Sequence, residues 1–434
     1  MDKMADVLGR AGAWCGQNKY LSAIKNAFQN FMPLTIAGAI GVLWCNVLVN
    51  DQTGLGLFFK PIMALDFLNP AFQAVNFCTI SCITVGITLG IAQEIGIWNM
   101  GAEKAGYIPG LVGLAAWLSV TNTSHMVEGA KAAFTGISGN ELGATGLFTG
   151  MIIGVLSVEL FCFFEKQDAL KIKMPEQVPP GVARAFEVLV PATITLIITA
   201  CIGSACYNLT GLYLNDVIKN GIQGPLGAVG ATIPGVMIIY LVIMLFWLVG
   251  IHGNNMLSAV KEALFTPLAL ENVEKFNKGE KPTNIINMYF LQMCGEFGGS
   301  GVTIGLVIAI MIFGKREDNK AIATLSLVPG LFNINETVTF GIPMVLNPIL
   351  GIPFVVAPLI TIIIGYVLTV IGFCPVACLT VPWTTPPIVF GFLACGANVM
   401  GAVTQAILIV VSTVIYVPFL IAYEKYQNKQ AAEA

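Results

Sequence analysis

The sequence predicts an all-α membrane protein with many transmembrane helices. Of its 434 residues, 56% are hydrophobic and only 10% are charged, whereas charged residues make up about 25% of an ordinary soluble domain. The apolar residues also form stretches long enough to cross a hydrocarbon core of about 30 Å, which takes roughly 20 residues of α-helix. Because so few charges cannot cover the surface of a soluble protein of this size, the composition indicates a polytopic membrane protein.

Nine apolar stretches are the expected spans, at 31–49, 75–97, 108–118, 147–164, 188–207, 233–251, 301–313, 353–373 and 401–423. Three further apolar pieces, at 285–294, 321–340 and 374–393, are interrupted by glycine, proline and polar residues, so they are poor candidates for simple spans. Residues 7–28 keep an apolar face at helical spacing, and we expect this stretch to lie on the membrane surface. The first span is too long for a cleavable signal, so we expect it to remain in the mature protein.

The positions of Lys and Arg predict the orientation, because cytoplasmic loops are enriched in these residues. The connections at 50–73 and 208–232 carry one lysine each. Basic residues are denser before the first span and after the fourth, at Lys3, Arg10, Lys19, Lys25, Lys166, Lys171, Lys173 and Arg184. This alternation places the N-terminus in the cytoplasm and the 208–232 connection outside.

Two further basic stretches, at 261–281 and 315–320, bracket the segment 284–314. If both stretches face the cytoplasm, this segment must enter and leave the membrane on the same side. Two spanning helices need about 40 residues, so the sequence predicts a re-entrant hairpin here. Non-helical backbone at membrane depth is tolerated where it lines protein or a water-filled cavity. We therefore expect residues 231–434 to be the transport half and residues 1–230 the scaffold.

Ionisable side chains inside apolar segments are rare and costly, which makes each one a candidate for a substrate site. Glu336 lies beside Asn333 and Asn335, and this carboxylate and these amides form a suitable set of acceptors and donors for the hydroxyls of a polyol. The alternative for Glu336 is a carboxyl that caps a broken helix inside the protein. Glu296 fits hairpin packing and a substrate site equally well.

A second candidate group ends the sixth span. His252 precedes Gly253, Asn254 and Asn255, so close backbone approach and amide groups are available to a substrate; the alternative is a helix-end histidine bonded to a neighbouring carbonyl. Trp383 stands among three prolines and offers a rigid face for stacking on a sugar ring, since ligand sites combine apolar walls with a few polar groups. An interfacial anchor is the alternative reading of Trp383.

Other classes of protein find no support in the sequence. It contains no P-loop GxxxxGK[ST], no zinc motif and no GxSxG elbow, which argues against an ATPase, a metal site and a serine hydrolase. The eleven cysteines are expected to be small buried hydrophobic residues, and His125 a surface histidine. We expect no metal, no cofactor and no nucleic-acid partner. The best fit is a transporter of a polar solute, with a sugar first among the candidates.

Three runs in the second half resemble one known family. They are HGNN at 252–255, the series NE (335–336), FGIP (340–343), LNP (346–348) and IPF (352–354), and VPWTTPP at 381–387. Together with NFMP at 30–33 and GATGLF at 143–148, they are similar to the membrane (IIC) component of the bacterial phosphoenolpyruvate-dependent sugar phosphotransferase system, in its lactose/cellobiose/diacetylchitobiose branch. The resemblance covers essentially the whole chain. It departs at Thr337, where proline is expected, and this loosens the local turn and bears on sugar preference.

The resemblance implies a homodimer of protomers with about ten transmembrane helices and two re-entrant hairpins. The N-terminal half would form the dimer interface and the C-terminal half would hold a β-linked disaccharide such as cellobiose, diacetylchitobiose or lactose. Glu336 and His252 match the family positions that bind the hydroxyl to be phosphorylated, and either could accept its proton. We expect the remaining contacts to come from Asn254, Asn255, Asn335 and Trp383.

The resemblance also implies partners and a location. A IIB protein would donate phosphate from its phosphocysteine at the cytoplasmic face. No soluble stretch of this chain is long enough to fold as IIB, so we expect separate IIB and IIA proteins, and a transporter that takes part in sugar phosphorylation only with IIB. The expected location is the bacterial cell membrane. A cation-coupled secondary sugar transporter, with Glu336 as its coupling group, and a membrane-embedded enzyme are the alternatives.

Overall fold

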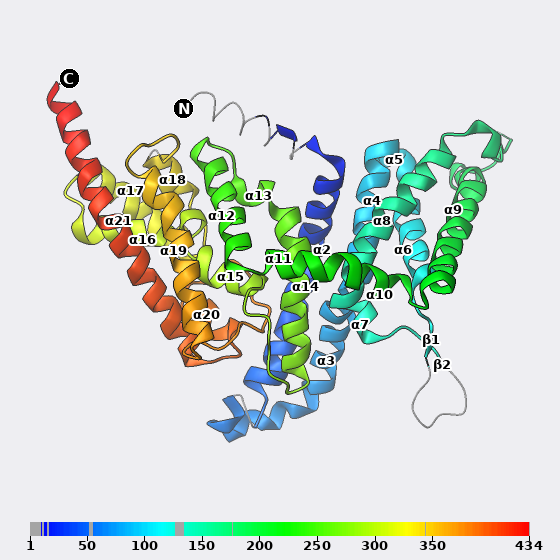
Figure 1. Cartoon of the computed structure of the whole chain (residues 1–434), viewed down its shortest axis with the longest axis horizontal. Coiled ribbons are helices and arrows are strands. Elements are labelled where there is room, and N and C mark those ends of the chain that lie inside the picture. Colours follow the sequence, from blue (N-terminus) through cyan, green and yellow to red (C-terminus); the bar gives the residue numbers. More distant parts are fainter. Residues whose placement is uncertain are drawn as a thin grey trace. The chain divides into compact units, whose positions relative to one another are not determined.

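The computed structural model describes residues 10, 13–14, 17–51, 55–125, 134–175, 177–342 and 344–433. Their regular structure is helical, apart from a two-residue antiparallel strand pair, β1 (Ser124–His125) and β2 (Phe134–Thr135). The chain divides into two compact units, each described here by itself (Figure 1). Unit 1 comprises Met1–Gly16, Ala39–Ala74 and Val229–Ala434, and unit 2 comprises Gln17–Gly38 and Val75–Ala228.

Each of the nine expected spans is mostly helical. Among the described residues, six helical stretches are long and apolar enough to cross a membrane: Lys19–Leu48, Lys60–Met100, Ala144–Glu165, Pro180–Thr210, Gly351–Val370 and Val399–Glu433. A seventh candidate is the pair Met288–Val302 and Ile304–Phe313, bent by 59°, and the apolar helices Ile108–Val120 and Ile233–Leu248 are shorter. The predicted all-helical, multi-pass membrane fold is therefore confirmed.

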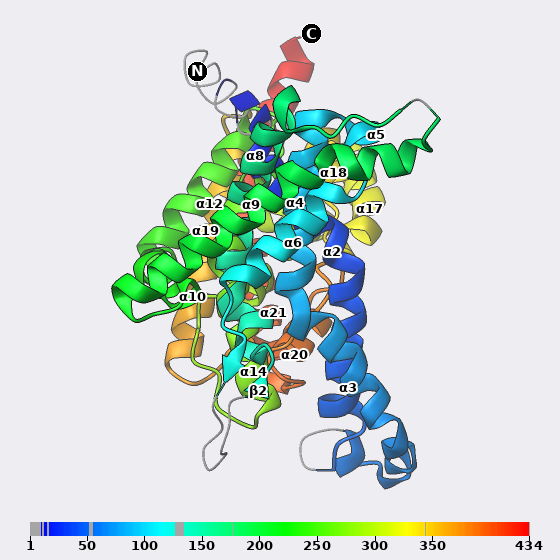
Figure 2. The same ribbon diagram turned by 90° about the vertical axis from the view of Figure 1, so that its right-hand side faces the viewer.

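Unit 2 is built on three helices that pack on one another, α4 (Ile83–Met100), α6 (Ile108–Val120) and α8 (Ala144–Glu165), with α9 (Pro180–Thr210) against α6 and α8 (Figure 2). Small residues allow the close approach: a Cβ atom at Gly113 would lie 2.3 Å from that of Ala92, and one at Gly150 would lie 2.2 Å from Oγ1 of Thr88. Such contacts suit helices in lipid, where packing replaces the hydrophobic effect as the force between them.

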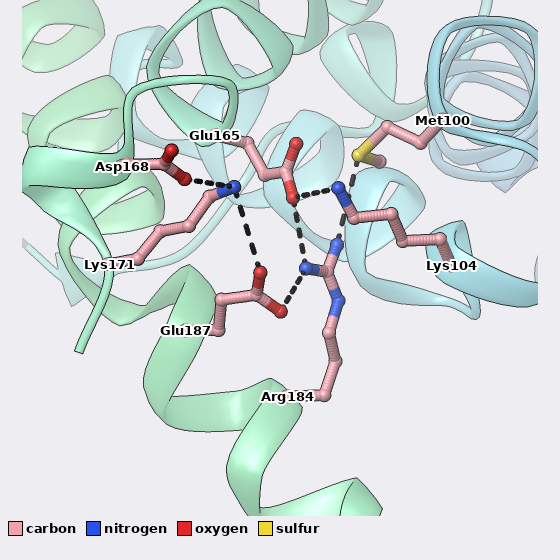
Figure 3. Close-up of polar contacts among 7 residues, drawn as sticks. All are labelled: Met100, Lys104, Glu165, Asp168, Lys171, Arg184 and Glu187. Atoms are coloured by element: carbon pink, nitrogen blue, oxygen red, sulfur yellow. Dashed lines mark hydrogen bonds and ion pairs between the residues drawn. The ribbon is translucent and has the colours of Figure 1, made fainter. Parts of the chain in front are cut away.

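One end of unit 2 carries a network of ion pairs (Figure 3). The buried Glu165, at the end of α8, accepts from Lys104 at 2.8 Å and from Arg184 at 3.0 Å. Arg184 also contacts Glu187 at 2.7 Å, and Lys171 lies 3.8 Å from Glu187. The basic segment after the fourth expected span is thus fixed to the ends of α8 and α9.

The apolar face at 21–28 belongs to the first span rather than to a separate surface stretch. α2 (Lys19–Leu43) is one continuous helix with Pro33 inside it, and no break separates the early apolar face from the expected span at 31–49. Residues 7–9, 11–12 and 15–16 of that stretch, together with Lys3 and Pro343, lie outside the described residues.

The shorter α-helices are α3 (Asn69–Cys78), α5 (Ala102–Ala105), α7 (Gly139–Leu142), α10 (Leu214–Ile218), α11 (Gly224–Gly230) and α13 (Gly253–Met256). The 3-10 turns are Leu55–Leu57, Lys60–Leu68, Ile80–Cys82, Asp168–Leu170 and Ser300–Val302, and the π turns are Trp44–Leu48 and Lys219–Gln223.

The longest helix of unit 1, α21 (Val399–Glu433), orders the rest of the unit along its length. α16 (Ile304–Phe313) and α19 (Gly351–Val370) pack beside it (Figure 1). Near its start, Gln405 donates to the carbonyl of Met293 at 3.1 Å, and near its end, Glu424 accepts from the backbone N–H of Lys315 at 2.9 Å. From α15 (Met288–Gly295) to Lys315, the chain therefore advances along α21 as one interrupted helix.

The prediction of a re-entrant hairpin at 284–314 is wrong. It required the basic stretches before and after this segment to lie on the same side, and they do not. α14 (Ser258–Asn277) is a 20-residue helix, about 30 Å long, which carries the chain from the buried Lys261 to Phe276. Phe276 lies against Gly396, where a Cβ atom would approach its ring to 2.9 Å, at the start of α21. The basic stretch that follows α14 therefore lies at the opposite end of unit 1 from Lys315, about 35 Å away along α21.

Two other segments of unit 1 fold back on themselves. In the first fold-back, α17 (Glu317–Leu331) leaves the Glu424 end and α18 (Glu336–Gly341) returns, so that a Cβ atom at Gly341 would lie 2.8 Å from Ile322. In the second fold-back, residues 371–398, the carbonyl of Ala394 on α20 (Val389–Ala394) accepts from Cys378 at 2.7 Å. The two fold-backs coincide with the interrupted apolar pieces at 321–340 and 374–393.

Candidate functional site

The tips of both fold-backs meet at the break between α15 and α16, and Asn333 joins all three segments. Its Oδ1 accepts from the backbone N–H of Gly298 at 2.6 Å, and its Nδ2 donates to the carbonyls of Trp383 at 2.5 Å and Thr385 at 3.1 Å. Asn333 has φ 62°, a left-handed conformation in which Asn is enriched among residues other than Gly. One amide therefore fixes the relative positions of three chain segments.

The break itself depends on glycine. Gly298, Gly299 and Gly301 have φ values of 70°, 89° and 78°, a region that costs other residues free energy. At Gly301 a Cβ atom would also lie 2.3 Å from the ring of Phe354 on α19. The buried Asn335, from the first fold-back, donates to the carbonyl of Ser300 at 2.7 Å. The glycines at 298, 299 and 301 are thus where the helix opens and where the tip of the first fold-back docks.

At this tip, Glu336 faces His252, with its Oε1 4.0 Å from Nε2 of the imidazole. Nδ1 of His252 accepts from the backbone N–H of Asn255 at 3.2 Å and so caps α13. In the neutral imidazole, the proton is therefore on Nε2 and points toward Glu336. The imidazole also packs on the ring of Trp247, with centroids 4.4 Å apart, which holds its orientation.

A separation of 4.0 Å is too long for a direct hydrogen bond but suits one intervening oxygen. A hydroxyl at about 2.8 Å from both atoms would accept from Nε2 and donate to the carboxylate. Because Nδ1 already accepts from Asn255, Nε2 is the nitrogen that would donate to this hydroxyl.

The remaining predicted site residues lie around this pair in unit 1. Nδ2 of Asn254 donates to Oγ of Ser300 at 2.9 Å, and Asn255 is exposed. Trp383 is 44% exposed, and its contact with Asn333 uses only its backbone carbonyl, which leaves the indole available. The structure therefore gathers Glu336, His252, Asn254, Asn255, Asn335 and Trp383 about one region; their roles in binding stay a prediction.

Lys261 was not predicted as part of the site, because it was counted with the basic stretch at 261–281. Lys261 is only 6% exposed and forms an ion pair with Glu296 at the end of α15. The hydroxyl of Tyr240 on α12 (Ile233–Leu248) donates to the same carboxylate oxygen at 2.8 Å. Glu296 was a signal in the sequence, because a carboxylate inside an apolar segment requires a counter-charge. The sequence did not show which cation supplies that charge.

Two further ionisable residues, Glu94 and His125, belong to unit 2. Glu94 on α4 accepts from Nδ2 of Asn26 on α2 at 2.8 Å, a contact between two helices within unit 2. The side chain of His125 lies outside the described residues.

Comparison with known proteins points to one family. The family described as "Phosphotransferase system, EIIC" matches residues 25–358. The chain is 32% identical to the oligo-beta-mannoside-specific EIIC component of Bacillus subtilis over 98% of its own length and 94% of the relative. It is 30% identical to the cellobiose-specific EIIC component of Lactococcus lactis, covering 98% of each chain.

A solved structure gives the same result. The crystal structure of the transporter ChbC, the IIC component from the N,N'-diacetylchitobiose-specific phosphotransferase system, superposes with a TM-score of 0.88 at 29% identity and covers 97% of both chains. The family match extends over most of the sequence and contains both Glu336 and His252. The chain therefore belongs to the EIIC family of the phosphotransferase system.

Proposed function

We propose that this chain is the permease that translocates a β-linked disaccharide, such as cellobiose, diacetylchitobiose or lactose, and presents it for phosphorylation. Two of the relatives are named for cellobiose and N,N'-diacetylchitobiose, both β-linked disaccharides, and a third is named for oligo-beta-mannosides. The observation that carries the proposal is the pair of His252 and Glu336, 4.0 Å apart at the tip of a fold-back. A sugar hydroxyl fits between this donor and this acceptor.

In this proposal, Glu336 and His252 hold the hydroxyl that receives phosphate. Asn254 and Asn255 offer amide groups to other hydroxyls, and the exposed indole of Trp383 stacks on a sugar ring. Asn335 is buried and bonded to Ser300, so its contribution is to fix the position of Glu336. Polar groups around one aromatic face match the composition expected of a small-molecule site.

The chemical step would take place with the phosphocysteine of a IIB protein, itself recharged through IIA. The sugar oxygen attacks phosphorus, the P–S bond breaks, and the cysteine leaves as a thiolate. The hydroxyl proton passes to Glu336, or to His252, as the new O–P bond forms. Glu336 is the better base of the two here, because the Nε2 of His252 already carries a proton.

The arrangement in the membrane is also a proposal. Lys19, Lys104, Lys171 and Arg184 pair with acidic residues at one end of unit 2, and the positive-inside rule places this end, with the N-terminus, in the cytoplasm. Unit 1 supplies the sugar site between its two fold-backs, which would be re-entrant. Unit 2 would provide the scaffold and the interface of a homodimer in a bacterial cell membrane.

Direct binding tests the substrate class. We expect the purified protein to bind cellobiose, diacetylchitobiose or lactose in calorimetric titrations, and to bind the α-linked disaccharide maltose at least tenfold more weakly. Maltose is the matched control because it differs from cellobiose only at the anomeric linkage. Equal affinity for maltose and cellobiose, with no binding of the other two sugars, would contradict the proposed substrate class.

A further inference from the structure

A buried ion pair lies beside the proposed sugar site, and none of the proposed sugar contacts uses it. Lys261, on the first turn of α14, pairs with Glu296 at the end of α15. Tyr240 supports the pair, because its hydroxyl donates to Glu296 at 2.8 Å and its ring lies 5.7 Å from the ammonium. An ammonium inside a protein is costly even when it is paired, so its further contacts are informative.

The second contact of Lys261 is with a proposed sugar ligand. Its ammonium donates to Oδ1 of Asn254 at 3.4 Å. Because an ammonium has donors and no acceptor, only the oxygen end of the Asn254 amide can face it. The nitrogen end must then point away, and it donates to Oγ of Ser300 at 2.9 Å. That bond uses one of the two amide hydrogens, and the other remains for a sugar oxygen.

The same contacts continue to the tip of the first fold-back. Ser300, which accepts from Asn254 through its side chain, accepts through its carbonyl from Asn335 at 2.7 Å. Asn335 directly precedes Glu336. An unbroken series of hydrogen bonds therefore runs from the ammonium of Lys261 to the residue before the proposed base.

We propose that Lys261 is a positioning residue for sugar recognition. Glu296 holds its ammonium in place, the ammonium fixes the orientation of the Asn254 amide, and Ser300 passes this constraint to the tip that carries Glu336. Lys261 itself does not touch the sugar. The inference rests on the proposed function, because it assigns a role within that same site.

Two neutral double variants separate positioning from charge balance. Lys261→Met with Glu296→Gln removes both charges together, which a buried pair tolerates better than the loss of one partner, and leaves no donor for Asn254. Lys261→Gln with Glu296→Gln is equally neutral but restores a side-chain N–H. We expect the Met pair to raise the Kd for the preferred disaccharide about tenfold, as for one lost hydrogen bond, and the Gln pair to stay within about threefold of the wild type.

A cycle with Asn254 tests the route of the effect. If Lys261 acts through Asn254, then Asn254→Ala raises Kd about as much as the Met pair, and the combined variant shows no further rise. Lys278→Met is the control, because this lysine directly follows α14, the helix that carries Lys261. It is 56% exposed and pairs only with Glu274 among the described ion pairs. Its Kd should equal that of the wild type, and size-exclusion profiles and thermal midpoints check folding throughout.

Each outcome has a definite meaning. A folded Met pair with the Kd of the wild type, or losses that add with Asn254→Ala, would overturn the positioning role and leave the proposed function intact. If the Met pair does not fold, the Gln pair decides: binding within about threefold supports the inference, and a tenfold loss in the folded Gln pair overturns it. A wild-type protein that binds no β-linked disaccharide would overturn both.

Discussion

At the scale of single residues, the chemistry depends on which nitrogen of His252 is free. The backbone N–H of Asn255 occupies Nδ1, and the ring of Trp247, tilted by 47° against the imidazole, limits its rotation. Nε2 is therefore a donor in a fixed position, and the carboxylate opposite it is an acceptor. The two groups suit a hydroxyl that gives up its proton while its oxygen stays bound.

Replacing Glu336 with glutamine separates binding from proton transfer. Glu336→Gln keeps the size of the side chain and an oxygen acceptor, so we expect sugar affinity to fall by no more than about tenfold. We expect the rate of sugar phosphorylation with IIB to fall at least about 100-fold, because general bases contribute roughly 10²–10⁴. Rapid-quench assays at saturating sugar measure this rate.

The matched control for this variant is Glu317→Gln in the same fold-back, since the side chain of Glu317 is 86% exposed and contacts Lys320. It should phosphorylate at the wild-type rate. A full phosphorylation rate in Glu336→Gln would remove the proposed role of Glu336 as the base.

Trp383 can be tested without disturbing the fold-back, because Asn333 bonds to its backbone carbonyl. Trp383→Ala should weaken disaccharide binding about tenfold or more, since burial of a large apolar side chain is worth about 1.5–3 kcal/mol. Trp383→Phe keeps an aromatic face and should retain most of the affinity. Equal and small losses in the two variants, measured by calorimetry, would assign this tryptophan to anchoring instead of stacking.

At the scale of elements, the break between α15 and α16 organises unit 1. Gly301 sits at this break with φ 78°, and its carbonyl accepts from the hydroxyl of Tyr416 on α21 at 2.8 Å. The site exists because this helix is interrupted where the tips of both fold-backs arrive. A continuous helix would fill its own backbone hydrogen bonds and offer none to Asn333 or Asn335.

Two glycine variants distinguish backbone strain from packing at the break. Gly301→Ala combines a left-handed φ, which costs about 1–2 kcal/mol, with overlap onto Phe354, which costs about 1–3 kcal/mol more. Gly372→Ala has a similar φ of 79° in open space, so it carries the strain alone. We expect Gly301→Ala to lower the thermal midpoint in detergent clearly more than Gly372→Ala. Equal decreases in the midpoint would show that the ring of Phe354 moves aside with no loss of stability.

The sequence predicted the helices better than the path between them. Each long apolar stretch became a helix, because hydropathy reports lipid contact directly. α14 escaped notice because Lys261, Glu271 and Asn272 make it too polar for a simple span, although these side chains are satisfied inside the protein: Asn272, for example, donates to the carbonyls of Asn284 at 2.8 Å and Ala377 at 3.0 Å. Such pairings depend on residues far apart in the chain and leave no local pattern.

At the scale of the whole molecule, the failure to recognise α14 as a long helix changed the predicted topology. With α14 read as a cytoplasmic loop, the basic stretches on both sides of 284–314 had to lie on one face, and a hairpin followed. The structure instead sends α14 along unit 1, so that Lys278 and Lys315 lie at opposite ends. The interrupted pieces at 321–340 and 374–393 are the segments that fold back, and their glycines, prolines and asparagines were the correct signal.

The candidate site was largely visible in the sequence, because an ionisable group in an apolar segment is conspicuous. Glu336 and His252 were predicted as site residues in this way, and Trp383 was predicted from the three prolines around it. Their proximity was not predictable from spacing, since 84 positions separate His252 from Glu336 and Asn333 brings the second fold-back to the first. Ser300 and Lys261 were missed because each acts by holding another side chain.

The central claim is that this molecule couples entry of a sugar to its phosphorylation. The most direct measurement loads membrane vesicles with IIB, IIA, the general phosphotransferase proteins and phosphoenolpyruvate, and identifies the chemical form of labelled cellobiose or diacetylchitobiose that accumulates inside. The account predicts sugar phosphate inside, dependent on phosphoenolpyruvate and on IIB. Free sugar that accumulates under an ion gradient without IIB would contradict it and make Glu336 a coupling carboxylate.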